Sequence, residues 1–239
     1  MILGANDLGD RRTELLPQPE EKARAVRSMF DRIAPRYDLV NRVMTFGLDV
    51  GWRRRAVGEL GLSAGSLVID VACGTGDFCR DLEAAGRRAV GVDYSAGMLA
   101  RARTHAPLVQ ADALALPFRT GCADGVTSGF ALRNVVDLHR AFREMARVLR
   151  PRGRVALLEV SEPRSAPARA AHSLYFRRVV PLIGGLLSDR SAYDYLPASV
   201  DYLPSTEELM GMLERAGFED LSATQLALGA AQLLVATRS

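Results

Sequence analysis

Lysine is nearly absent from this sequence: Lys22 is the single example, although Lys and Arg together number 31. Asp and Glu number 28, so the formal net charge is only +3. Aromatic residues make up 6% of the chain and are not interleaved with runs of arginine. Because proteins that bind nucleic acids usually carry a concentrated basic surface, we expect no nucleic acid among the partners.

Cysteine and histidine are also scarce. Cys73, Cys79 and Cys122 show no CxxC spacing and no histidine close by in the sequence. Zinc sites and disulfide frameworks require regular spacings of these residues. We therefore expect no metal site and a reducing, cytoplasmic setting. The three histidines are scattered, and none is assigned a catalytic role.

Long apolar runs are missing as well. No stretch reaches the roughly 20 apolar residues of a membrane-spanning helix. Residues 1–22 lack the apolar segment of a signal peptide and contain Pro17 and Pro19, which predicts a flexible N-terminal segment. We expect a cytoplasmic protein that contacts the inner face of the cell membrane at most peripherally.

Residues 23–239 predict a single domain in which strands and helices alternate. Its expected parts are N-terminal helices broken at Pro35 and near Gly47 (23–60), a cofactor-binding core (64–160), an insertion (161–203), and a C-terminal helix with two strands (204–239). Short apolar segments predict strands at 66–71, 88–93, 108–110, 124–130, 155–160, 220–225 and 232–237. Helices are expected up to residue 85 and over 96–104, 138–149 and 206–216. This alternation predicts an α/β fold with a doubly wound, mostly parallel, seven-stranded sheet.

A glycine-rich turn follows the first predicted strand, where residues 68–77 read VIDVACGTGD. Gly74 and Gly76 allow a sharp turn and a close approach to a ligand. Asp93 ends the second strand, where an acidic side chain holds the two hydroxyls of a ribose. The carboxyl ends of parallel strands are where ligands bind in this class of sheet, so a nucleoside-containing cofactor is expected.

The choice of cofactor depends on charge. The third glycine of a dinucleotide-binding motif is replaced by Cys79, and four carboxylates surround the turn: Asp70, Asp77, Asp93 and Asp112. They would repel a pyrophosphate and attract the sulfonium and ammonium groups of S-adenosyl-L-methionine. We therefore predict this cofactor. A nicotinamide-dependent oxidoreductase and a non-catalytic binder of S-adenosylmethionine stay open as alternatives.

Several residues are predicted to contact the cofactor. Thr75 is expected at its methionine portion, and Asp112 and Ala113 at its adenine ring. Ser128, at the end of the fourth strand, is expected where cofactor and acceptor meet. For Thr75 and Ser128 a local backbone hydrogen bond is the alternative. The predicted set from the residues is Asp70, Gly74, Thr75, Gly76, Asp93, Asp112, Ala113 and Ser128.

The segment after the fourth strand limits the acceptor. Residues 128–135 read SGFALRNV and contain no Pro-Pro pair, which enzymes that methylate nucleic-acid amino groups place here. Methylation of a nucleobase amino group is therefore disfavoured.

The sequence resembles the ubiquinone/menaquinone biosynthesis C-methyltransferases from about Ala25 to its end. The matching segments are FDRIAPRYD (30–38) with Asn41, Trp52-Arg53, 70–77, Asp93, Met98-Leu99, Asp112, LPF (116–118), FALRN (130–134), RVLRP (147–151), LEVS (158–161), YDYL (193–196) and Gly217-Phe218. The resemblance implies the Rossmann-like fold of class I S-adenosylmethionine-dependent methyltransferases, with Met98 at the cofactor. It also implies methylation of a prenylated quinol, demethylmenaquinol, at a ring carbon. A ubiquinone precursor or another phenol is the alternative acceptor.

The resemblance also implies a set of acceptor-side residues. Arg133 is expected to assist removal of a phenolic proton, through a water that it orients, since a guanidinium itself does not act as a base. Asn134 is expected to hold the other ring oxygen. Tyr37, Asn41 and Tyr195 are expected to line the acceptor pocket, with core packing as the alternative for both tyrosines. An exposed arginine at a helix end is the alternative for Arg133.

The predicted insertion contains an apolar segment, residues 174–187, that is broken by two arginines and by Pro181. Its composition suits a lid over a lipid-tailed substrate, a peripheral membrane contact or a homodimer contact. The sequence leaves these three interpretations open.

Overall fold

The structure of the protein is a computed structural model that describes residues 19–163, 165–175, 178 and 202–239. The predictions for residues 1–18, for Tyr195 and for most of the segment 174–187 lie outside the described residues. Among the described residues no helix has the length and apolar character needed to cross a membrane.

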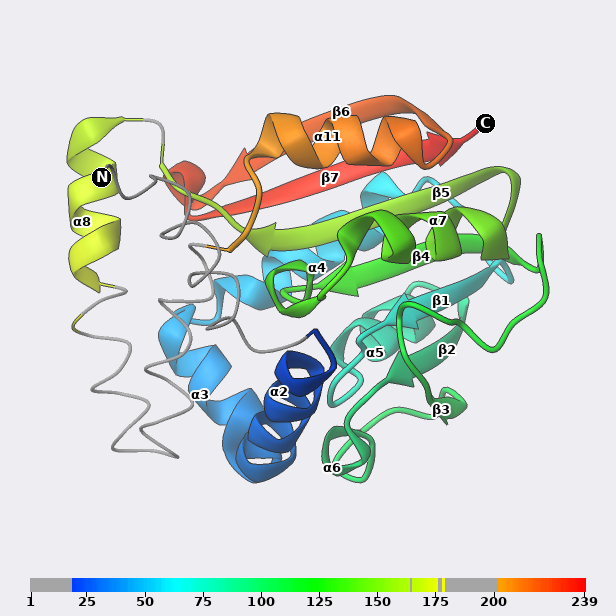
Figure 1. The fold of residues 1–239 in the computed structure, drawn as a ribbon, viewed down its shortest axis with the longest axis horizontal. Helices are drawn as coiled ribbons and strands as arrows, with labels where there is room; N and C mark the ends of the chain where they lie inside the picture. The colour runs from blue at the N-terminus through cyan, green and yellow to red at the C-terminus, as the bar shows by residue number, and fades with distance from the viewer. Residues whose placement is uncertain (1–18, 164, 176–177, 179–201) are drawn as a thin grey trace, which may run out of the picture.

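A seven-stranded sheet forms the centre of the protein (Figure 1). Its strands are β1 Leu67–Val71, β2 Arg88–Asp93, β3 Leu108–Gln110, β4 Ala123–Gly129, β5 Leu149–Val160, β6 Phe218–Leu226 and β7 Ala231–Arg238. They follow the order β3-β2-β1-β4-β5-β7-β6. Strands β1 to β5 run parallel to one another, whereas β7 runs antiparallel to β5 and β6. The predicted α/β class with a mostly parallel seven-stranded sheet is confirmed.

Helices cover both faces of the sheet. They are α2 Pro19–Ile33, η1 Ala34–Arg36, α3 Tyr37–Met44, α4 Leu48–Glu59, α5 Asp77–Ala84, α6 Ala96–Leu99, η2 Leu132–Asn134, α7 Leu138–Val148, α8 Ala166–Leu174, α11 Thr206–Arg215 and η4 Ala227–Gly229. α4 and α5 lie on one face, and α7 and α11 lie on the other (Figure 1).

The strand residues alternate between these two layers. In β1, Val68 belongs to the core cluster beneath α4 and α5, while Ile69 belongs to the cluster beneath α7 and α11. Successive side chains of a strand point to opposite faces, so a strand covered on both sides is apolar throughout. This is why the parallel strands appear in the sequence as continuous apolar runs.

The N-terminal helices form a smaller cluster beside the sheet. Ile33 of α2 and Val40 of α3 pack there against Met98 of α6. The chain changes direction at Pro35, within η1, and again at Gly47, whose φ of 74° precedes α4. This cluster places α2 and α3 next to the loops that follow β1 and β2.

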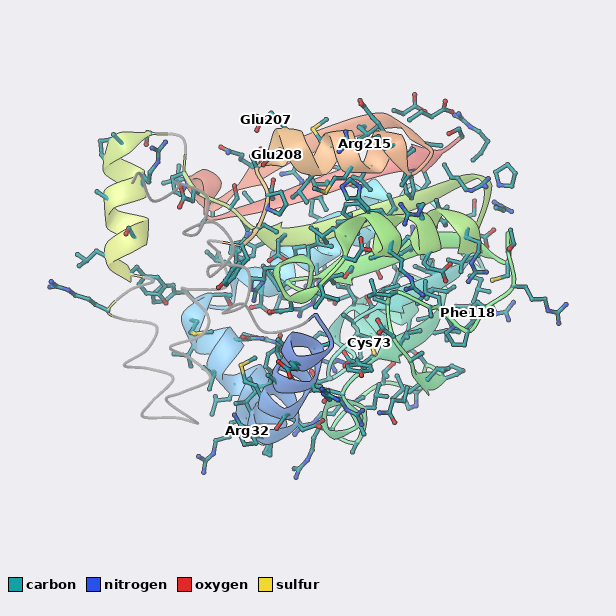
Figure 2. All side chains as sticks on the ribbon, viewed as in Figure 1. Arg32, Cys73, Phe118, Glu207, Glu208 and Arg215 are labelled. Atoms are coloured by element: carbon teal, nitrogen blue, oxygen red, sulfur yellow. The ribbon has the colours of Figure 1, made fainter. Side chains whose placement is uncertain are left out.

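Toward the C-terminus, side chains at the two ends of α11 stabilise this helix. Ser205 and Glu208 form a reciprocal capping box at its start. Figure 2 shows Glu207 and Glu208 at one end of this helix and Arg215 at the other. Acidic residues in the first turn and a basic residue in the last turn complement the helix dipole, which stabilises the helix.

Two predicted boundaries are wrong. The helix predicted over 96–104 ends at Leu99, because the chain then turns back to the glycine loop, where Arg103 donates its backbone N–H to the oxygen of Thr75 at 3.1 Å. The fifth strand begins at Leu149 rather than Val155. The Pro-Arg-Gly segment, residues 151–153, is part of the strand. It is accommodated there by a register irregularity opposite residues 123–125 and by a φ of 66° at Arg152.

Candidate active site

A cavity opens at the carboxyl ends of β1, β2 and β4, where the strand order reverses. Open sheets of this type bind ligands at that position. The empty volume is ≈ 900 Å³, open solvent at its mouth included. Residues of α2 lie along one side of the cavity, and the loops after the strands form the other sides.

The glycine turn between β1 and α5 forms part of the cavity wall. Gly74 lines it with a φ of 55°, and Gly76 follows with a φ of 82°. A Cβ atom on Gly76 would lie 2.9 Å from Cγ2 of Thr104. Gly76 therefore serves close packing behind the turn, while Gly74 presents its backbone at the cavity.

Asp93 connects this turn to the end of β2. Its carboxylate accepts hydrogen bonds from the backbone N–H of Gly74 at 2.7 Å and of Ser95 at 2.8 Å. Burial raises the pKa of Asp93 above its ordinary value, against these two hydrogen bonds. A carboxylate has about four lone-pair directions, so Asp93 retains acceptor capacity for the hydroxyls of a ribose.

The adenine-side predictions also converge on the cavity. Asp112 and Ala113, after β3, line it together with Met98 of α6. Asp112 accepts the backbone N–H of Leu114 at 2.9 Å, which fixes the orientation of its carboxylate. Apolar walls with one oriented carboxylate fit a flat ring that carries an amino group, as adenine does.

Four predicted cofactor residues are absent from the lining of this cavity: Asp70, Thr75, Gly76 and Ser128. Asp70 is buried beneath the turn, where Thr127 donates a hydrogen bond to it at 2.9 Å. Burial raises the pKa of Asp70 to about 7. The hydroxyl of Thr75 donates to Asp38 of α3, and Ser128 is buried within β4. In this structure these residues do not line the cavity but pack beneath the loops and strand ends that form its wall.

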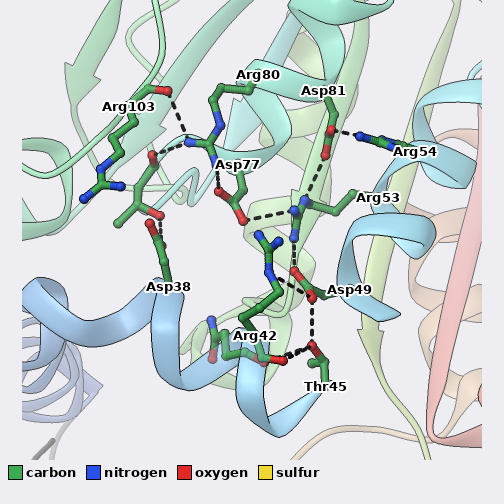
Figure 3. A network of polar contacts seen from close by, with 12 residues as sticks. Asp38, Arg42, Thr45, Asp49, Arg53, Arg54, Asp77, Arg80, Asp81 and Arg103 are labelled. Atoms are coloured by element: carbon green, nitrogen blue, oxygen red, sulfur yellow. Dashed lines mark hydrogen bonds and ion pairs between the residues drawn. The ribbon is translucent and has the colours of Figure 1, made fainter. Parts of the chain in front are cut away.

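The prediction that the carboxylate of Asp77 contributes to the negative charge around the ligand is wrong. This carboxylate turns away from the cavity and forms ion pairs with Arg53 at 3.0 Å and with Arg80 (Figure 3). Of the four carboxylates, only Asp93 and Asp112 line the cavity. They remain sufficient to favour a cationic ligand over a pyrophosphate.

Arg53 is the centre of the polar network in Figure 3. Its buried guanidinium pairs with Asp49 at 2.5 Å, Asp77 at 3.0 Å and Asp81 at 2.9 Å. Because Asp77 and Asp81 lie on α5, the network fixes the start of that helix, and with it the glycine turn, against α4. Only the i,i+4 spacing of Asp49 and Arg53 hinted at this network in the sequence.

Two aspartates tie the N-terminal helices to the cavity loops. Asp31 of α2 accepts hydrogen bonds from the hydroxyl of Ser95 at 2.5 Å and from the backbone N–H of Gly97 at 2.9 Å. Asp38 of α3 accepts the hydroxyl of Thr75. Neither aspartate was predicted from the sequence to have a role, and both hold helices in place beside the site.

The acceptor-side candidates Arg133 and Asn134 lie on η2, directly after β4. Asn134 lines the first cavity, whereas Arg133 lines a second one beside it. The empty volume of the second cavity is ≈ 1770 Å³, open solvent included. The two cavities share six lining residues: Ala23, Tyr94, Asp112, Leu114, Val135 and Val136.

Arg133 is only 7% exposed, so it is not a surface arginine at a helix end. Its guanidinium pairs through Nη1 with Glu159 of β5, which is 0% exposed. Its Nε atom is buried and has no hydrogen-bond partner among the residues that the structure describes. Sequence reasoning missed Glu159, although the segment LEVS that contains it had been noted.

Tyr37 lines the first cavity, and its ring meets that of Phe30 edge-on at 6.0 Å. Burial raises the pKa of its phenol, against a side-chain hydrogen bond with Asn41. Asn41 does not line this cavity and acts on it through Tyr37. Tyr195 lies outside the described residues.

The fold resembles those of solved methyltransferases. A possible histamine N-methyltransferase from Thermotoga maritima superposes with a TM-score of 0.65 at 21% identity, over 90% of this chain and 100% of that one. A methyltransferase from Aquifex aeolicus gives a TM-score of 0.57 at 15% identity, over 78% and 89% of the two chains. The protein thus has the fold of S-adenosylmethionine-dependent methyltransferases, and this predicted class is confirmed.

Sequence relatives give the family. The model of the ubiE/COQ5 methyltransferase family matches residues 18–238. A demethylmenaquinone methyltransferase from Roseiflexus castenholzii is 43% identical, over 92% of this chain and 96% of its own. A second from Thermus thermophilus is 44% identical over 80% and 91%. The ubiquinone/menaquinone biosynthesis C-methyltransferase UbiE of Geobacter sulfurreducens is 42% identical over 89% and 88%. The chain belongs to the ubiE/COQ5 methyltransferase family, as its motifs predicted.

Proposed function

We propose that this protein transfers a methyl group from S-adenosylmethionine to a ring carbon of a demethylmenaquinol, producing menaquinol. The observation that carries the proposal is the position of Arg133 and Asn134 on the wall between two adjoining cavities. One cavity has the residues expected for the methyl donor, and the other leaves room for an acceptor. Relatives named demethylmenaquinone methyltransferase support the choice of acceptor.

The donor would occupy the first cavity. Asp93 would accept the ribose hydroxyls, Gly74 would give the methionine portion close access to the backbone, and Met98, Asp112 and Ala113 would enclose the adenine. When bound, S-adenosylmethionine supplies an electrophilic methyl group, whose C–S bonding electrons stay with sulfur as the ring carbon takes the methyl. Asp70, Thr75, Gly76 and Ser128 would keep the loops in place from behind.

The acceptor has to be the reduced quinol, because a quinone ring is too poor in electrons to attack a methyl group. Loss of one phenolic proton makes the neighbouring ring carbon nucleophilic. After transfer, that carbon loses its own proton, the ring becomes aromatic again, and the phenolate oxygen takes up a proton, so each turnover releases one proton in total. Positioning of the two partners and stabilisation of the phenolate supply the rate enhancement.

Arg133 is the proposed electrostatic partner of the phenolate. A guanidinium keeps its charge at neutral pH, so it orients a water that removes the phenolic proton and stabilises the resulting anion. Asn134 would bind the second ring oxygen. Tyr37, which is supported by Asn41 and lines the first cavity, would face the edge of the acceptor ring that is next to the donor. Tyr195 remains a proposed acceptor contact. Since relatives are also named for ubiquinone biosynthesis, a ubiquinone precursor is the second candidate acceptor.

A peripheral membrane contact would bring the enzyme to a lipid-tailed quinol. Four apolar side chains on α3, the turn after it and the start of α4 are exposed: Leu39 (56%), Val43 (38%), Phe46 (75%) and Leu48 (50%). Arg36, at the end of η1 directly before α3, is also exposed. Exposed apolar side chains beside arginine suit an anionic lipid surface. We propose that this face rests on the cytoplasmic surface of the membrane.

Vesicle sedimentation tests the membrane contact. Vesicles with anionic lipid are expected to bind the protein, and Phe46→Ser is expected to weaken binding, whereas Leu228→Ser, at a separate exposed leucine, is expected not to. Equal binding of both variants would contradict the proposal. So would a homodimer in solution that Phe46→Ser dissociates, because this face would then be a subunit contact.

Methyl transfer tests the function directly. Labelled S-adenosylmethionine is incubated with chemically reduced demethylmenaquinone, with the oxidised quinone and a reduced ubiquinone precursor as controls. The expected product is menaquinol, formed from the reduced compound alone. If the protein binds the donor and methylates none of these compounds, the acceptor assignment fails.

A further inference from the structure

Glu159 is a buried carboxylate that the mechanism above does not use. It lies near the carboxyl end of β5, is 0% exposed, and faces the guanidinium of Arg133. Its Oε1 atom also accepts the backbone N–H of Val160 at 2.9 Å, and its Oε2 atom lies 3.4 Å from the backbone N–H of Arg133. One rigidly held carboxylate therefore contacts Arg133 at both its backbone and its side chain.

Glu159 uses only part of the hydrogen-bonding capacity of the Arg133 guanidinium. A guanidinium has five N–H groups, and Glu159 binds one of its terminal nitrogens. The Nε atom is buried, and no described residue accepts a hydrogen bond from it. A buried donor without an acceptor is costly, on the order of 1–3 kcal/mol, so native structures rarely leave one without a structural or catalytic reason. Glu159 holds this group beside the second cavity with a donor unpaired.

We propose that Glu159 is a positioning residue that holds Arg133 for a phenolic oxygen, and that its negative charge sets the ionisation of that phenol. This inference rests on the proposed function, because it uses Arg133 as the partner of the acceptor. The pair of Arg133 and Glu159 is neutral overall. A bound phenol therefore meets a directed hydrogen-bond donor without a net positive charge, and its proton is lost only when a water removes it.

Two variants separate charge from position. Glu159→Gln keeps the length of the side chain and removes its charge. The positive charge of Arg133, now unopposed, is expected to lower the pKa of the bound phenol by about one unit. The rate of transfer is nevertheless expected to fall about a hundredfold, because the neutral amide holds Arg133 less firmly and a more strongly stabilised phenolate is a weaker nucleophile. Glu159→Asp keeps the charge and shortens the reach. It is expected to slow transfer without moving the pKa of the phenol.

Two controls test whether Glu159 affects methyl transfer through Arg133. Gln232 of β7 lies opposite Glu159 in the sheet register, is also buried, and contacts Thr206 and Val160. Gln232→Met is expected to leave the rate of transfer and the pKa of the phenol unchanged. In a chain that already carries Arg133→Ala, Glu159→Gln is expected to add no further loss of rate, because Glu159 acts through Arg133.

The ionisation is measured by absorbance of 4-methoxy-1-naphthol, a phenol shaped like the quinol head group, bound together with S-adenosylhomocysteine. Methyl transfer to reduced demethylmenaquinone is measured in parallel. Transfer by the wild type with Glu159→Gln unchanged in rate and phenol pKa would overturn the inference but not the proposed function. The expected phenol shift without any transfer to the quinol would overturn the acceptor assignment and leave the role of Glu159 standing. Failure of the naphthol to bind the wild type would overturn the inference as well.

Discussion

Asp38 on α3 accepts a hydrogen bond from the hydroxyl of Thr75, the residue between the two glycines of the cofactor turn. This contact joins an N-terminal helix to the backbone that faces the donor, across 37 positions of sequence. The same helix begins with Tyr37, which lines the donor cavity. The cofactor turn and the adjoining wall of the cavity are thus held as one unit.

Thr75→Val should therefore weaken donor binding. The change removes the hydroxyl and leaves the carboxylate of Asp38 without this donor. A hydrogen bond to a charged group contributes about 1.5–3 kcal/mol, so the dissociation constant of S-adenosylmethionine is expected to rise about tenfold, measured by calorimetry. Thr75→Ser, which keeps the hydroxyl, is the matched control and should bind normally. Equal affinities for Val and Ser would show that the contact is not needed for binding.

Gly97→Ala should displace α2 from the cavity. A Cβ atom at this position would lie 2.9 Å from both Cα and Oδ1 of Asp31. Such overlap with backbone costs about 1–3 kcal/mol, and we expect a lower melting temperature together with weaker donor binding. Gly51→Ala is the control, because nothing lies within 4 Å of its Cβ position and alanine favours the helix by about 0.5–1 kcal/mol. Unchanged donor affinity in Gly97→Ala would mean that α2 does not shape the site.

Arg53→Met should lower the free energy of unfolding by about 3–5 kcal/mol, because it leaves buried carboxylates without their partner. Arg54→Met, at a side chain that is 73% exposed, should change it by less than about 0.5 kcal/mol. Urea unfolding at neutral pH measures both. A loss for Arg53→Met as small as that for Arg54→Met would contradict the role of the network.

The effect of Arg53 should also depend on pH. Burial alone would raise the pKa of Asp49, but hydrogen bonds from Thr45 and Arg53 hold it below its ordinary value. A lowered pKa contributes stability above the unfolded-state pKa, and this contribution is lost as the pH falls through the folded-state value. The stability difference between wild type and Arg53→Met is therefore expected to shrink as the pH falls below about 4. A constant difference across that range would argue against the ion pairs.

Asp70→Asn should increase stability at high pH, whereas Arg53→Met should decrease it. Burial raises the pKa of Asp70 from 3.8 to about 7. The folded state therefore holds a proton that the unfolded state has released, so the contribution of Asp70 to stability is lost as the pH rises from 3.8 to about 7. Asparagine cannot ionise and can still accept from Thr127. The variant is expected to match the wild type near pH 4 and to melt at a higher temperature at pH 8. Parallel melting curves at both pH values would contradict the raised pKa.

Local sequence patterns predicted much of the sheet and part of the site. β2 and β3 have the predicted bounds, because each is a short apolar run closed by polar residues. Gly74, Asp93 and Asp112 line one cavity because each lies at or just beyond the carboxyl end of a parallel strand, and parallel strands end at the same edge. The helix after β2 was predicted too long, since the pattern gave no sign that the chain turns back to Thr75.

Other members of the site were not predictable from spacing. Ser95 meets Asp31 across 64 positions, and Arg133 meets Glu159 across 26. No periodicity connects residues so far apart, and an acidic residue in an apolar strand or on a helix face is compatible with many partners. Asp77 was expected to face the ligand because it follows the glycine turn, but the side of the helix on which it lies directs it to Arg53.

The sequence by itself determined the order of strands and helices, the glycine turn and the acidic residues at the strand ends, because these features depend on contacts between near neighbours along the chain. The tertiary structure alone decided which carboxylates face the cavity, which ones pair with Arg53, and that Glu159 holds Arg133. Those choices depend on how helices and strands from distant parts of the chain pack together, such as α4 against α5 around Arg53 and η2 against β5 at Glu159. Burial then decides the rest, because a charge removed from water has to find a partner there.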